Sequence, residues 1–159
     1  MNRKVFLGIA VVLVVTAAGA AYYWFVLNGR SAPTGGQSSL STKTITIAGA
    51  SVVVEIADTD EARKQGLSKR SVLAPQHGML FVFPKDGNWG IWMKDMLFSI
   101  DILWADAAGK VVALNASISP ETYPAVFYPN NYTRYVLEVP AGFAAAHSIT
   151  VGSTMSLPQ

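Results

Sequence analysis

From residue 44 onward, apolar and polar side chains alternate in short runs that are typical of β-strands. Two runs rich in β-branched residues, 44–47 and 51–56, flank Ala48-Gly49-Ala50, and this arrangement predicts a β-hairpin. A short helix is expected to begin at Asp58, with a capping-box glutamate three residues later, and to end at a glycine, residue 66. The next apolar run, 79–83, predicts a strand that Pro84 closes.

The stretch from Ile91 to Asp106 is the most apolar run outside the N-terminus, and its periodicity fits either a helix or a strand. A strand over 99–105 is favoured, because the Gly-containing connection 106–110 leads directly into a second apolar run, 111–116. Strands at 132–139 and 150–157 and a helical turn at 143–147 complete the pattern. The sequence therefore predicts a mainly β (β-rich α+β) domain, a small antiparallel barrel or curved sheet with one or two short helices.

The N-terminal segment has the pattern of a membrane signal. A basic start, residues 1–4, precedes an uncharged apolar run from Val5 to Leu27, which as a helix would span roughly 34 Å, enough for a hydrocarbon core of about 30 Å. The basic flank favours a cytoplasmic N-terminus and an extracytoplasmic domain. The alternative is a secreted protein whose signal peptide is cleaved near residues 18–20. We predict a signal anchor over 1–27, a flexible Gly/Ser-rich linker over 28–41 and a globular domain over 42–159.

Composition narrows the chemistry that this domain can perform. The chain has no cysteine and two histidines, which excludes disulfides, thiol nucleophiles and histidine-rich metal cages, and we expect no cofactor. The whole chain has a formal charge of +2, but from Ser41 onward nine Lys/Arg stand against ten Asp/Glu, a net charge of −1. The domain therefore lacks the basic footprint of a nucleic-acid-binding protein, and we expect no nucleic-acid partner.

Several charged residues lie within apolar segments, where an ion must reach water or find a partner. Lys94 follows two bulky apolar residues, Asp101 lies between two isoleucines, and Glu138 lies between a leucine and a valine. Each carboxylate fits the polar side of a half-exposed strand, and the lysine fits a structural ion pair. The functional alternative is a single ligand-binding pocket lined by Arg70, Trp92, Lys94, Asp101 and Glu138. Two carboxylates in one pocket could bind a divalent cation or divide into acid and base.

Four segments share a characteristic order and spacing: Gly-Leu-Ser-Lys-Arg at 66–70, Gly-Met-Leu-Phe at 78–81, Trp-Met-Lys-Asp at 92–95 through Asp101, and Tyr-Val-Leu-Glu-Val-Pro-Ala-Gly at 135–142. Together they resemble the DUF192 family, also called UPF0127, over nearly all of residues 44–157. The resemblance implies a compact β-rich domain whose relatives are often exported or membrane-tethered. It implies no established activity.

Two functions are consistent with these residues. The first is a non-catalytic binding or accessory module, tethered outside the cytoplasmic membrane, that recognises a small ligand or another envelope protein; the aromatic loop 123–132 supports it. The alternative is a hydrolytic enzyme that uses Asp101 and Glu138 as acid/base groups, with Lys94 or Arg70 holding an anionic substrate. The sequence has no nucleophile elbow, phosphate loop or His-Glu zinc motif, which favours the first function.

Overall fold

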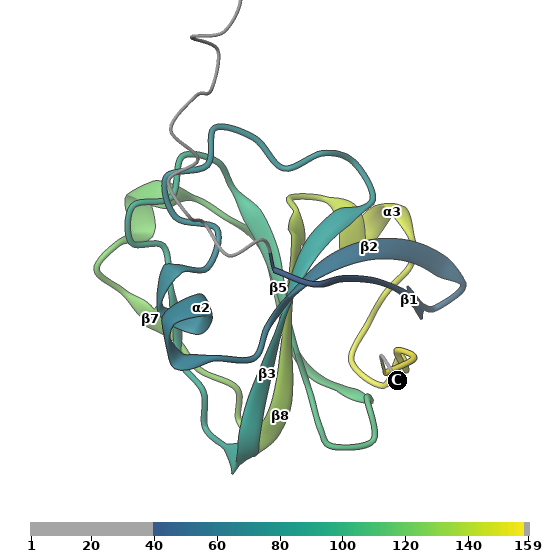
Figure 1. Cartoon of the computed structure of the whole chain (residues 1–159). Coiled ribbons are helices and arrows are strands. Elements are labelled where there is room, and N and C mark those ends of the chain that lie inside the picture. Colours follow the sequence, from purple (N-terminus) through teal and green to yellow (C-terminus); the bar gives the residue numbers. More distant parts are fainter. Residues whose placement is uncertain (1–39, 158–159) are drawn as a thin grey trace, which may run out of the picture. The chain divides into compact units, whose positions relative to one another are not determined.

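In the computed structural model, which describes residues 40–157, six strands form one mixed sheet and two short strands form a separate ribbon (Figure 1). In chain order the elements are β1 (Thr42–Ile47), β2 (Ala50–Ala57), α2 (Asp60–Gln65), β3 (His77–Gly87), β4 (Ile91–Trp92), β5 (Ile100–Ala105), β6 (Val111–Ile118), a 3-10 turn (Pro120–Thr122), β7 (Val126–Phe127), β8 (Thr133–Pro140) and α3 (Phe143–Ala146). The predicted membrane helix at 5–27 lies outside the described residues, as does the predicted linker up to residue 39. Within residues 40–157, no helix is long and apolar enough to cross a membrane.

The large sheet has the strand order β1-β2-β3-β8-β5-β6. Strands β2 and β3 are parallel, and the other neighbouring pairs are antiparallel. Parallel neighbours need a crossover connection, which α2 and the loop 66–76 provide. The expected β-rich fold with short helices is confirmed, and the one parallel pair makes the sheet mixed.

Local sequence signals predict two parts of this sheet well. The β-hairpin forms as expected, and its turn residues Ala48 and Gly49 have φ angles of 48° and 83°, the positive values that tight hairpin turns require. The strand expected at 99–105 is β5, one residue shorter at its start. All residues of β5 are buried, because it lies between β8 and β6 and both of its faces are covered.

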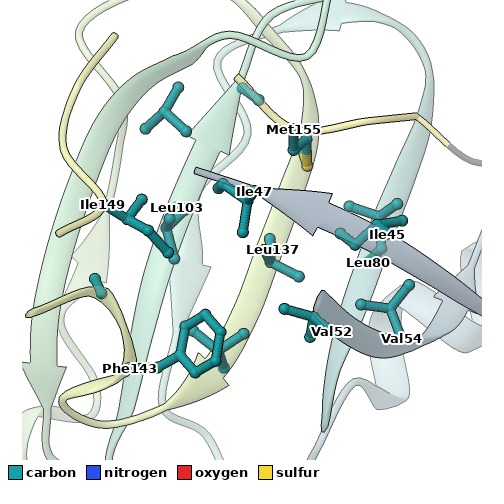
Figure 2. Packing of buried hydrophobic residues seen from close by; sticks show 14 of the residues in the cluster. Ile45, Ile47, Val52, Val54, Leu80, Leu103, Leu137, Phe143, Ile149 and Met155 are labelled. Carbon is teal, nitrogen blue, oxygen red and sulfur yellow. The ribbon is translucent and has the colours of Figure 1, made fainter. Parts of the chain in front are cut away.

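Each face of the sheet has its own hydrophobic core. On the face that packs against α3 and the C-terminal segment, here called the α3 face, the core contains side chains such as Ile47, Leu103, Leu137, Phe143 and Met155 (Figure 2). The opposite face, called the α2 face, is covered by α2 and by parts of the segments 67–73 and 89–98. Its buried residues are Ala57, Leu67, Met79, Phe81, Ile91, Met93, Met96, Ile100, Ile102, Trp104 and Val136.

Two predicted boundaries near the first helix are wrong. The N-cap of helix α2 is one residue later than expected, because the Thr59 side chain, not that of Asp58, caps the helix by accepting the backbone N–H of Ala62 at 3.1 Å. Strand β3 does not end at Pro84 but continues to residue 87. Its pairing with β8 is interrupted after Val82, and a proline is tolerated in such an irregular stretch because it has no N–H to donate.

The strand expected at 150–157 does not form. This segment makes only isolated bridges, Met155 to Ile47 and Thr154 to Lys110. The buried Met155 side chain belongs to the core of the α3 face, so the segment closes that core instead of extending the sheet.

Candidate functional site

Glu138 lies in the middle of the sheet, on β8 between β3 and β5. Its register partners are Met79 on β3 and Ile102 on β5, and both belong to the core of the α2 face. Side chains directly opposite each other in a sheet point to the same face. Glu138 therefore points into the apolar layer of the α2 face, where its residue is only 5 % exposed.

Among the described residues, 40–157, the Glu138 carboxyl group has no hydrogen-bond partner. In the same part of the chain, every side-chain oxygen or nitrogen that is fully buried has a hydrogen-bond partner. The two carboxyl oxygens of Glu138 therefore keep some exposure. Burial raises the pKa of Glu138 to about 8, and attraction to the Arg70 guanidinium offsets part of this rise. At neutral pH the group is therefore mainly a protonated acid that can both donate and accept a hydrogen bond.

A cavity of about 220 Å³ opens on the α2 face next to this carboxyl group; we call it the Glu138 cavity. Its lining combines apolar and aromatic side chains with the C-terminal half of α2: Arg63, Lys64, Gln65, Gly66, Leu67, Ser68, Phe81, Phe83, Gly90, Ile91, Trp92, Met96 and Glu138. The volume is far above the 10–15 Å³ or so that a single water needs. A hollow that combines apolar and aromatic walls with a few polar groups is the usual form of a small-ligand site.

Trp92 forms part of the rim of the Glu138 cavity. It is 50 % exposed, unlike its buried neighbour Met93. The Tyr123 ring meets it edge-on with the ring centroids 5.9 Å apart, and the Lys94 ammonium lies 5.5 Å from its centroid. Of these two bulky neighbours, only Met93 packs in the core, and Trp92 presents an aromatic surface to solvent and to the cavity.

Arg70 lies close enough to Glu138 to influence its charge, but its hydrogen bonds go to Glu55 on β2. The guanidinium donates two hydrogen bonds to the Glu55 carboxylate, Nη2 to Oε2 at 2.7 Å and Nη1 to Oε1. These hydrogen bonds are the main reason why the pKa of Glu55 is lowered. The sequence did not indicate Glu55 as a site residue, because a glutamate after three valines has the pattern of an exposed polar position in an edge hairpin.

Asp101 lies on the opposite face of the sheet. It pairs in register with Val139, the residue after Glu138, so its side chain points to the α3 face. There its carboxylate accepts backbone N–H groups from Ser117 at 2.7 Å, Gly142 at 3.1 Å and Ala144 at 2.8 Å. It ties β6 and the start of α3 to β5, and this set of hydrogen bonds explains why a carboxylate tolerates complete burial.

The predicted pocket is therefore assembled in part. Trp92 and Glu138 line the cavity. Lys94 does not line it but lies over the Trp92 ring, and Arg70 acts on Glu138 by charge alone. Asp101 is separated from all of them by the sheet, so it cannot form an acid/base pair with Glu138. Among residues 40–157, no group of three or more His, Cys, Asp or Glu side chains is placed to hold a metal ion.

Hydrogen bonds between two loops position the wall of the cavity. The Ser68 hydroxyl donates to the Lys94 carbonyl at 2.9 Å, and the Lys69 N–H donates to the Asp95 carbonyl at 2.7 Å. As a result, the segment 66–70 lies beside the segment 92–96. Each of the four segments that share the family pattern, 66–70, 78–81, 92–101 and 135–142, contributes at least one residue to the lining.

The amino-acid sequence of this chain is similar to those of known proteins. Two archaeal relatives, UPF0127 proteins of Thermococcus gammatolerans and Thermococcus kodakarensis, are 32 % and 30 % identical over 105 residues. The match covers 65 % of this chain and 65 % and 63 % of those relatives, so the chain spans just under two thirds of their length.

Two crystal structures have the same fold. A candidate transcription regulator from Sinorhizobium meliloti is 27 % identical with a TM-score of 0.72, and the match covers 76 % of this chain and 97 % of that one. A protein of unknown function from Novosphingobium aromaticivorans is 25 % identical with a TM-score of 0.70, covering 80 % and 94 %. The model of the family DUF192, described as uncharacterized ACR, matches residues 43–157. The chain belongs to the DUF192 (UPF0127) family.

Proposed function

We propose that this domain is a non-catalytic binding module that takes a small ligand into the Glu138 cavity. The observation that carries the proposal is the Glu138 carboxyl group, which has no hydrogen-bond partner within residues 40–157. It belongs to a residue that is only 5 % exposed, and it lies at the wall of a cavity of about 220 Å³. A buried polar group without a partner destabilises a protein, and natural structures keep such groups mainly where they serve a function. A ligand that supplies the missing partner would remove this cost.

The hydrolytic alternative needs a second acid or base beside Glu138. Asp101 is on the other face of the sheet, and the Glu55 carboxylate is held by both outer nitrogens of Arg70. Binding without catalysis therefore agrees better with the geometry. The charge of the domain gives no support for nucleic-acid binding, because residues 41–159 carry nine basic against ten acidic side chains.

The binding proposal is tested by a thermal-shift screen of the full-length protein against chemically diverse small molecules. A ligand at a hundredfold excess over its dissociation constant stabilises the folded state by about 3 kcal/mol, or about 10 °C for a domain of this size. The variant Met96→Trp, which fills the cavity from its wall, should abolish the shift, whereas Glu61→Gln on the exposed side of α2 should preserve it. No shift with any class of compound, or an equal shift in Met96→Trp, would remove the basis of the proposal.

We further propose that residues 5–27 hold this module on the outer side of the cytoplasmic membrane. The support is the apolar length and the basic flank of that segment. Since the chain has no cysteine, a Glu121→Cys variant carries a single thiol at an exposed site. A membrane-impermeant maleimide should label it in intact spheroplasts, and the labelled protein should stay in the membrane fraction. Labelling only after lysis would contradict the proposed orientation, and release into the medium would favour cleavage.

A further inference from the structure

Two glutamates face the same layer of the sheet but differ in their partners. The register runs from Glu55 through Met79 to Glu138, so both carboxyl groups lie on the α2 face on either side of one methionine. Glu55 is paired with the Arg70 guanidinium through two hydrogen bonds. Among residues 40–157, one of these two glutamates is thus paired with a cation and the other has no cation in contact.

The lack of a partner at Glu138 restricts which ligand group can stabilise it. Arg70 has both outer nitrogens committed to Glu55 and acts on Glu138 only through longer-range attraction. An ionised carboxylate in apolar surroundings needs a positive charge within contact distance. A neutral ligand would leave this group protonated, whereas a cationic ligand would allow it to ionise and form a charge-assisted hydrogen bond.

The walls of the Glu138 cavity are compatible with such a ligand. Phe81, Ile91 and Met96 provide apolar surface for an organic body. The Trp92 ring already attracts one ammonium group, that of Lys94, at 5.5 Å from its centroid.

The rim carries cations that would favour an anionic ligand instead, but their effect is weaker. Lys64 and Lys94 are exposed to water, where the dielectric constant is high, and Arg63 is paired with Asp60. Glu138 interacts in a low-dielectric site, so its preference outweighs that of the rim.

We infer that the ligand of the Glu138 cavity is a small amine, with one ammonium group that pairs with Glu138 and an apolar or aromatic body that packs against Phe81, Ile91, Trp92 and Met96. This inference rests on the proposed binding function and names its ligand class. On binding at neutral pH, the Glu138 carboxyl group loses its proton to the buffer and the resulting carboxylate pairs with the ligand's ammonium group. No bond to the ligand forms or breaks other than this hydrogen bond.

The test uses three probes that share a phenylethyl body, 2-phenylethylamine, 2-phenylethanol and 3-phenylpropanoate, with the full-length protein in isothermal titration calorimetry at pH 7. The amine should bind about 10- to 100-fold more tightly than the alcohol, the range expected for a hydrogen bond to a charged group. Titration in two buffers of different ionisation enthalpy should show close to one proton released per amine bound. Replacing Glu138 by glutamine should remove both the preference and the proton release, while Glu61→Gln should change neither.

Each other outcome overturns the amine assignment. Equal affinity for amine and alcohol, or tighter binding of the carboxylate, contradicts it but leaves the Glu138 cavity as a ligand site. Failure of all three probes to bind also contradicts it, and the broader thermal-shift screen then decides separately whether the binding function itself fails. If Glu138→Gln does not fold, proton release by the unsubstituted protein still distinguishes an ammonium on Glu138 from a neutral ligand.

Discussion

The burial of Glu138 makes the stability of this protein depend on pH in a defined direction. The pKa of Glu138 is raised from 4.5 to about 8, chiefly by burial. Between these two pH values the folded protein keeps this proton while the unfolded chain has released it. The free energy of unfolding therefore falls as the pH rises through this window, and the loss is complete above pH 8.

The size of this effect follows from the width of the window. At about 1.4 kcal/mol for each pH unit, the span from 4.5 to about 8 corresponds to about 5 kcal/mol. Domains of this size are stable by only about 5–15 kcal/mol, so the loss is readily measured. A glutamine at position 138 mimics the protonated acid, so the variant Glu138→Gln should lack this component and be more stable than the unsubstituted protein at pH 9.

The assay is urea unfolding of the full-length protein and of Glu138→Gln at a series of pH values from 4.5 to 9. The difference between the two free energies of unfolding cancels the titration of all other groups and should change by about 5 kcal/mol across the range. Glu55→Gln is the matched control, because the pKa of Glu55 is lowered and its difference should stay constant above pH 5. Parallel curves for the unsubstituted protein and Glu138→Gln would refute the reasoning, since they would mean that Glu138 is already ionised in the folded state.

Three further predictions concern neighbouring residues. Asp101→Asn should lower the free energy of unfolding by about 3 kcal/mol in urea titrations, because asparagine offers one acceptor oxygen where three backbone N–H groups now donate. Ligand binding should persist in this variant, and its loss in folded protein would contradict a purely structural role for Asp101. Arg70→Gln should raise the pKa of Glu138 further, seen as a higher midpoint in the same pH series, and an unchanged midpoint would show that the guanidinium does not act on it. Gly78→Ala should destabilise the domain by about 1–3 kcal/mol in thermal or urea unfolding, because a Cβ atom there would lie 2.6 Å from the Glu138 carbonyl oxygen. Unchanged stability would mean that β3 and β8 separate easily at this point.

The local pattern of the sequence was enough to predict much of the fold. The β-branched runs around Ala48-Gly49 form the hairpin, and the run 99–105 forms a strand as predicted, one residue shorter at its start. These features depend on residues close together in the chain, where a turn or a period of two is visible directly. The family was recognised for a similar reason, because its four motifs are short contiguous segments. The local pattern failed for the segment 150–157, which was predicted as a strand but forms only isolated bridges, because no strand of the sheet pairs with it over several residues.

The candidate site depended on pairing that the sequence does not display. Asp101 and Glu138 look alike in the sequence, each a lone carboxylate between apolar neighbours, and only the register of β5 against β8 sends one to the α3 face and the other to the α2 face. A shift of one residue exchanges the two faces, so no local pattern can determine this outcome. The partner of Arg70 was hidden in the same way, because Glu55 meets it only after β2 and β3 align. The sequence alone thus determined which charged groups had to be accommodated in an apolar sheet, and the tertiary structure decided which of them is satisfied by the protein and which is left to face the cavity.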